Sequence, residues 1–288
     1  QVYRYDLTKV IFSIFFIFPF IYTISKLNQH TLYKEALYMT TKSLQRSQIT
    51  LRTLILIGLF SAICYVSLYF KIPIPSPVGK PFLHMGNMFV ILAGLLFTGP
   101  IGGAAGAIGM GLFDALNGYA DSVPKTIILK FGIGLFVGLV AAKGNKKDAK
   151  SPLKWVGISA GILIIGGLIL MALALTKGHE IAIAGIEKTL VLNPVLYIFA
   201  LILGVGLAVV CIVGRKISIK MQYAILGAVV GIAFNLVGEF VFGAIKLLLA
   251  GSAFSPAIIS SAVSLPATLI NGSFSIVVAL ILYTPLNK

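Results

Sequence analysis

The sequence is poor in charge, in cysteine and in histidine. Lys, Arg, Asp and Glu together make up 11% of the 288 residues, which is about half the share found in soluble domains. Two cysteines are too few for a disulfide scaffold, and three widely spaced histidines offer no zinc-ligand spacing. No G-x-x-x-x-G-K-[ST] loop occurs, so the chain does not bind ATP by that route. These absences exclude an ordinary soluble enzyme, a disordered chain and a P-loop ATPase.

What the sequence has in excess is hydrophobic residues, at 58% with a mean hydropathy of +1.02. A membrane-spanning helix needs about 20 apolar residues, and the chain has room for several. Cys64 and Cys211 both fall inside apolar runs and are expected to be small, buried hydrophobes. We therefore predict an all-α integral membrane protein.

Eight apolar runs follow Met39 and predict eight transmembrane helices. They lie at 53–70, 88–98, 101–117, 125–142, 155–176, 192–213, 223–250 and 257–284. A proline-rich loop at 71–87 separates the first two, because proline prevents helix and favours extended backbone.

Residues 1–38 stand apart from this map. The chain begins with Gln1, and 9–27 is an aromatic-rich apolar run without a small-residue cleavage site after it. One interpretation is an extra helix or an uncleaved signal anchor. The other rests on Lys34-Glu35-Ala36, whose codons can contain a bacterial ribosome-binding sequence upstream of Met39. We expect residues 1–38 to be translated upstream sequence, with Met39 as the start.

The net charge of +15 has a topological explanation. If Met39 lies inside, twelve Lys and Arg residues fall on the inner side and five on the outer side, as the positive-inside rule requires. This predicts a multi-pass protein of the bacterial cytoplasmic membrane with both ends of 39–288 inside. The basic loops are expected to face anionic lipid, not nucleic acid.

Small residues four apart recur along the predicted helices and allow close helix contact. The pairs are Gly58 and Ala62, Gly102 and Gly106, Gly134 and Gly138, and Gly227 and Gly231. Each predicts packing inside the bundle or docking to another membrane protein.

Charges at bilayer depth are costly, at about 2.5–3.5 kcal/mol each on insertion scales, and therefore mark function. Four occur: Asp114, Lys130, Glu239 and Lys246. Asp114 and Lys130 flank the hairpin between two helices and could pair with each other or contact a ligand. Asn235, Glu239 and Asn271 are expected to converge with them on one polar cavity, below a loop that offers His84 and Tyr119.

The stretch 81–141 resembles the substrate-binding S components of energy-coupling factor (ECF) transporters, closest to the riboflavin-type S-component family. The family pattern H-x-G-[DN], G-P-x-x-G, D-x-x-x-G-Y and P-x-T-x-x-x-K is matched at four places. The matching residues are His84, Gly86, Asn87; Gly99, Pro100, Gly103; Asp114, Gly118, Tyr119; and Pro124, Thr126, Lys130. The run 264–283 is similar to the last helix of the family.

The resemblance implies a six-helix bundle that binds a vitamin near the outer face. It implies docking on a transmembrane T component with two ATP-binding cassette ATPases, through small residues at Gly58 and Ala62. The chain departs from the family by an inserted helix pair. We thus expect core helices one to four in 39–142, the insertion in 143–221, and the last two core helices in 222–288.

The function expected is a non-enzymatic vitamin-binding subunit without a cofactor. Candidate substrate-binding residues are His84, Asn87, Asp114, Tyr119, Lys130, Asn235, Glu239 and Asn271. The substrate classes are pyridoxine, hydroxymethylpyrimidine and riboflavin, with the first two favoured. The alternative is a self-sufficient proton-coupled transporter with Asp114 and Glu239 as carriers. An intramembrane enzyme ranks last, because no catalytic constellation stands at membrane depth.

Overall fold

The computed structural model describes residues 50–73, 82–178, 180–181, 190–191 and 194–287. Contacts divide the chain into two compact units, residues 1–51 and Arg52–Lys288. Nearly all of the first unit, and with it the predicted upstream segment, lies outside the described residues.

Eight α-helices occur in the described part of the chain, at the places where the apolar runs predict them. They are α3 (Leu51–Ser67), α4 (Gly86–Leu96), α5 (Gly99–Leu116), α6 (Val123–Ala141), α7 (Leu153–Lys177), α8 (Pro194–Val213), α9 (Ile219–Leu249) and α10 (Phe254–Leu286). Five of these, α6 to α10, are long and apolar enough to cross a membrane. The prediction of an all-α integral membrane protein is confirmed.

Two short antiparallel hairpins complete the described structure. Strand β1 (Lys71–Pro73) pairs with β2 (Phe82–His84), so that Lys71 lies opposite His84. The extended backbone expected from the prolines is present at these two strands, and residues 74–81 between them lie outside the described residues. Strands β3 (Glu180–Ile181) and β4 (Leu190–Val191) pair beyond α7.

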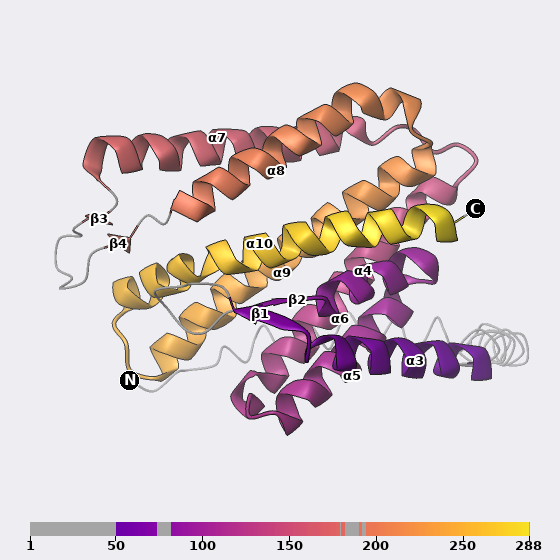
Figure 1. The fold of residues 1–288 in the computed structure, drawn as a ribbon, viewed down its shortest axis with the longest axis horizontal. Helices are drawn as coiled ribbons and strands as arrows, with labels where there is room; N and C mark the ends of the chain where they lie inside the picture. Colours follow the sequence, from indigo (N-terminus) through magenta and orange to yellow (C-terminus); the bar gives the residue numbers. More distant parts are fainter. Residues whose placement is uncertain (1–49, 74–81, 179, 182–189, 192–193, 288) are drawn as a thin grey trace, which may run out of the picture. The chain divides into compact units, whose positions relative to one another are not determined.

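The helices form two packing groups (Figure 1). Helix α6 packs between α5 and α9, and α10 packs on α4 and α9. Helices α7 and α8 pack mainly on each other, and α8 also touches α10. The core between α4, α6 and α9 is built from fully buried aliphatic residues, such as Val90, Ile133 and Ala228.

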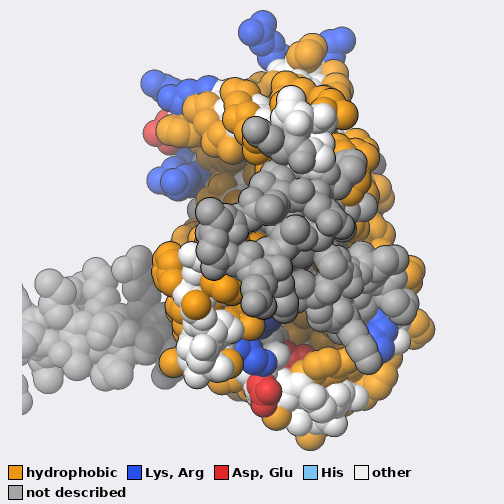
Figure 2. Space-filling model, turned by 90° about the vertical axis from the view of Figure 1, so that its left-hand side faces the viewer, with side chains coloured by type: hydrophobic (Ala, Val, Ile, Leu, Met, Phe, Trp, Pro, Cys, Tyr) orange, Lys and Arg blue, Asp and Glu red, His pale blue; other side chains and the backbone are white. Residues whose placement is uncertain are grey.

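Glycines let α5 and α6 approach to backbone contact. A side chain added at Gly134 would collide with the backbone of Gly102 and Gly103, and one at Gly138 would collide with Gly99. The small-residue spacing in these two helices therefore serves packing inside the bundle, as one of the two interpretations predicts. On the face drawn in Figure 2, hydrophobic side chains cover much of the described surface, several Lys and Arg side chains gather at its upper edge, and others lie with acidic side chains in its lower part.

Candidate functional site

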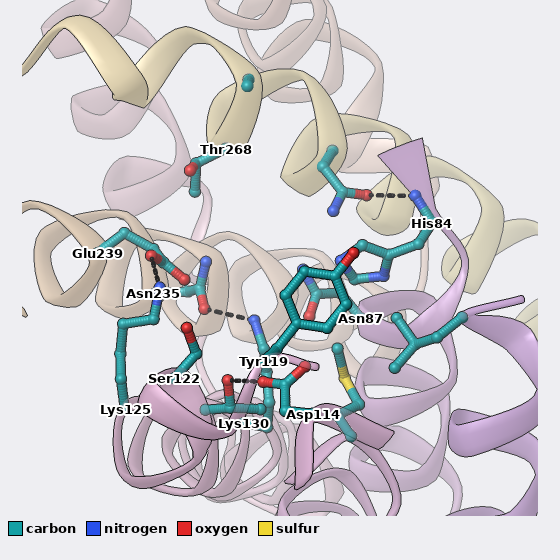
Figure 3. Close-up of a pocket in the computed structure, with 15 residues that line it drawn as sticks. His84, Asn87, Asp114, Tyr119, Ser122, Lys125, Lys130, Asn235, Glu239 and Thr268 are labelled. Atoms are coloured by element: carbon teal, nitrogen blue, oxygen red, sulfur yellow. Dashed lines mark hydrogen bonds and ion pairs between the residues drawn. The ribbon is translucent and has the colours of Figure 1, made fainter. Parts of the chain in front are cut away.

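A cavity of about 230 Å³ lies among α4, α5, α6, α9, α10 and the end of β2. All eight residues predicted to bind substrate line it (Figure 3). Polar groups from five helices and a strand thus meet in one place, although up to 187 positions separate them in the chain. Its full lining is Leu68, His84, Asn87, Met110, Asp114, Tyr119, Ser122, Lys125, Thr126, Lys130, Asn235, Glu239, Ala267, Thr268 and Asn271.

An ion pair crosses the cavity between α6 and α9. Lys125 Nζ lies 2.8 Å from Glu239 Oε2, and the two side chains keep 32% and 22% of their surface exposed. Lys125 occupies the first turn of α6. The pair is therefore reachable from the cavity, where a ligand could compete for either partner.

A second cation, Lys130, is buried one and a half turns further along α6. Its Nζ donates a 3.0 Å hydrogen bond to Oδ1 of Asn235, which is also buried. Asp114 instead accepts a hydrogen bond from the hydroxyl of Thr126. The ion pair that the sequence suggested between Asp114 and Lys130 is not formed, because Asn235 on α9 and Thr126 on α6 satisfy the two groups separately.

His84 closes the cavity at the end of β2. Its backbone N–H donates to Asn271 Oδ1 at 3.4 Å, and its Nδ1 accepts the Gly86 N–H at 3.2 Å. Burial lowers the pKa of His84 to about 3, and the positive charge of Lys130 adds to the decrease. The imidazole is thus neutral at physiological pH, with its proton on Nε2 because Nδ1 is an acceptor.

Asn87 and Tyr119 differ in how open they are. Asn87, in the first turn of α4, is 2% exposed, and its Oδ1 has no hydrogen-bond partner among the described residues. A buried acceptor without a partner costs about 1–3 kcal/mol, so a ligand donor would find a ready partner there. Tyr119 is exposed at the mouth, where it stacks on Phe113 with a 6.3 Å centroid distance.

Seven lining residues are not among those predicted from the sequence. Lys125 counts only among the outer-side cations of the predicted topology, and its spacing of five residues from Lys130 does not place the two on one face of a helix. Thr126 stands inside the quoted P-x-T-x-x-x-K pattern, which was the available signal. The remaining five residues gave no signal in the sequence, because apolar and small polar residues at helix spacing look alike in any packed bundle. They are Leu68, Met110, Ser122, Ala267 and Thr268.

The second predicted site, Gly58 and Ala62, lies on an exposed face of α3. A side chain added at Gly58 would meet no atom within 4 Å. Leu54, Ile55 and Leu59 around it are each more than half exposed. This face therefore takes no part in packing the described bundle.

Comparison with known proteins gives two matches. The sequence model of the ECF-type riboflavin transporter S component family matches residues 48–209, more than half of the chain. A Pyrococcus woesei protein, described as an uncharacterized protein in the gap 3' region, is 30% identical over 114 residues, which cover 40% of this chain and 73% of that one. No solved structure matches. With the family match spanning α3 to most of α8, the chain belongs to the family described as ECF-type riboflavin transporter, S component.

Proposed function

We propose that this protein is the vitamin-binding subunit of an ATP-driven ECF importer and that its ligand is a single-ring vitamin or precursor, such as pyridoxine or hydroxymethylpyrimidine. The size of the cavity carries the choice of ligand. At about 230 Å³, it is smaller than the pockets of about 300–1,000 Å³ that hold drug-sized ligands. A tricyclic flavin with its ribityl chain needs more room than a substituted pyridine or pyrimidine.

The charges of the cavity favour a neutral or zwitterionic ligand. Lys125 and Lys130 balance Asp114 and Glu239, and His84 is neutral. Two acidic residues and one lysine would favour a cationic heterocycle; the second lysine, Lys125, removes that preference. Ring nitrogens and hydroxyl groups suit such a lining, because amide, carboxylate and ammonium groups offer both donors and acceptors.

We further propose that α3 to α6 with α9 and α10 form the six-helix core, and that α7 and α8 are the inserted pair. The cavity supports this assignment, because its helical lining comes from α3 to α6, α9 and α10 and their adjoining turns, while α7 and α8 contribute none of it. The family match runs through α7 and ends inside α8, so it does not itself mark this pair as an insertion. The assignment of the pair rests on the cavity, and the equivalence of the last two helices rests on the cavity and on the resemblance of 264–283.

In this assignment the chain binds ligand and its partners supply the energy. A T component and two ATP-binding cassette ATPases would complete the importer, and the exposed face of α3 at Gly58 and Ala62 is the proposed docking surface. Both ends of 39–288 are proposed to lie on the cytoplasmic side of the membrane.

Ligand binding to the purified protein tests the proposal. We expect pyridoxine or hydroxymethylpyrimidine to bind at least about tenfold more tightly than riboflavin in calorimetric titrations, which corresponds to about 1.4 kcal/mol. Mass spectrometry of small molecules that co-purify with the chain provides an independent readout. Preferential binding of riboflavin would overturn the choice of ligand, and binding of none of the three would remove the vitamin assignment.

A further inference from the structure

A second and larger cavity lies between α8, α9 and α10. Its volume is about 610 Å³, and it shares no lining residue with the proposed vitamin site. The two cavities are nevertheless neighbours, because adjacent residues line them. Leu83 and Ile270 line the large cavity, and His84 and Asn271, the next residues in the chain, line the small one. Helix α8, of the α7–α8 pair, therefore lines a separate space beside the core.

The lining of this cavity is almost entirely hydrocarbon. Ser273 is the one polar side chain among the lining residues that the structure describes, and its hydroxyl donates a 2.8 Å hydrogen bond to the Leu269 carbonyl. The cavity thus presents no side-chain polar group that awaits a ligand. The cavity opens to the outside of the bundle, because Ile202 and Val277 on its wall are each more than half exposed. Apolar surface is stabilised by apolar surroundings rather than by water, so a space of this size and chemistry calls for an apolar occupant.

The dimensions of the cavity match one leaflet of a bilayer. Its lining runs from Phe199 to Val210 on α8 and from Ile270 to Leu280 on α10. At 1.5 Å per residue these stretches are about 15 Å long, half of the hydrocarbon core of about 30 Å. An acyl chain of a phospholipid has this length and this chemistry.

Positive charge stands at one end of the same cavity. Arg215 and Lys216 follow α8 five and six residues after Val210, and Lys220 precedes the lining residue Ile225 on α9 by five. All three cations are exposed, and no ion pair within 4 Å joins them to an acidic side chain in the described ranges. A cation beside an anionic membrane surface strengthens binding about fivefold.

We propose that an anionic phospholipid binds here. One acyl chain fills the cavity between α8, α9 and α10, and the phosphate lies on Arg215, Lys216 and Lys220 in the leaflet next to the α8–α9 turn. The acyl chain then packs between α8 on one side and α9 and α10 on the other, in the space that protein side chains leave open. This site is independent of the vitamin and of its identity.

Gly206 offers a way to fill the cavity without disturbing the fold. It lines the cavity on α8, and a side chain added there would meet no atom within 4 Å. Gly206→Leu should reduce binding of phosphatidylglycerol at least fivefold, measured by native mass spectrometry of the full chain in detergent. Gly166→Leu is the matched control, because Gly166 on α7 also has open space around it but lies outside the lining. It should bind as the unchanged protein does.

The double variant Arg215→Gln, Lys216→Gln tests the head group. It should lose the preference for phosphatidylglycerol over phosphatidylcholine and keep its binding of phosphatidylcholine. Thermal unfolding in detergent establishes that each variant is folded. Unchanged phosphatidylglycerol binding in folded Gly206→Leu would overturn the proposal, and so would an equal loss in Gly166→Leu, which would indicate surface lipid only. An undiminished preference for phosphatidylglycerol in the double variant would overturn the assignment of the phosphate.

Discussion

At the scale of single residues, the polar groups at membrane depth are held by specific partners. Lys130 reaches Asn235, Asp114 reaches Thr126, and Lys125 reaches Glu239. Burying a polar group without a partner is costly, so these contacts let the cavity exist within an apolar bundle. The buried Oδ1 of Asn87 is the exception on the cavity wall, and it marks where a ligand has most to gain.

Removing the charge of Glu239 should weaken ligand binding. We expect Glu239→Gln to lower affinity for the tightest single-ring ligand at least about tenfold, because charge-assisted hydrogen bonds are stronger than neutral ones. Asp121→Asn is the matched control: Asp121 pairs with Lys246 at 3.6 Å, but both side chains are largely exposed and outside the cavity. Calorimetric titration measures both. Wild-type affinity in folded Glu239→Gln would remove Glu239 from the site.

His84 should make stability depend on pH in acid. Its pKa of about 3 in the folded chain lies below the usual 6.5, so between these values the unfolded chain binds a proton that the folded chain does not. Stability contributed by the neutral imidazole is therefore complete above about pH 6.5 and is lost as the pH falls towards 3.

The variant His84→Asn isolates this effect. Thermal unfolding in detergent between pH 7 and 4 should show a smaller loss of stability for His84→Asn than for the unchanged chain. Parallel curves for the two proteins would show that His84 titrates normally in the folded state.

At the scale of elements, glycine positions decide which helices can touch. Helices α5 and α6 meet at backbone contact through Gly134 and its neighbours, whereas α3 keeps an exposed apolar face around Gly58. The same four-residue spacing of small residues therefore produces internal packing in one place and a free surface in another.

Substituting Gly134 should destabilise the bundle. The added side chain of Gly134→Val would meet the backbone of Gly102 and Gly103, and overpacking of this kind costs about 1–3 kcal/mol or more. Gly161→Val on α7 serves as the control, since no atom lies within 4 Å of the position. A clear decrease in Tm is expected for Gly134→Val only; equal Tm values would contradict the tight α5–α6 contact.

At the scale of the whole molecule, the residues that line the cavity are separate from the surface proposed to dock a partner, the exposed face of α3. The cavity lies among α3 to α6, α9 and α10 with their adjoining turns, while α7 and α8 stand beside it. Many large hydrophobic side chains are exposed, and several cations gather at the upper edge of the face in Figure 2; both fit a protein surrounded by lipid.

Transport should need both partners and the face of α3. Vitamin uptake by cells is expected only when the T component and ATPases are co-expressed. Gly58→Leu should abolish uptake and leave ligand binding within about twofold, because the position is open in the structure and distant from the cavity lining. Gly161→Leu should transport normally. Proton-driven uptake by the chain alone would instead favour a secondary transporter.

Much of this organisation could be predicted from the sequence. Eight apolar runs gave eight helices, because a bilayer leaves an unpaired backbone few alternatives to helix. The eight candidate residues line one cavity. Most of them could be recognised in the sequence because polar groups are rare at bilayer depth. The partners of Asp114 and Lys130 could not be predicted, since a hydrogen bond depends on distances of a few tenths of an ångström between separate helices.

The sequence by itself determined the membrane setting, the helix positions and eight of the polar residues that meet, because each follows from local composition, spacing or a recognisable motif. Only the tertiary structure decided that Lys125 joins the site and balances its charge, that the cavity is small, and that a separate apolar space lies beside α8. These properties depend on how helices far apart in the chain pack in three dimensions, and packing is a property of all their side chains together.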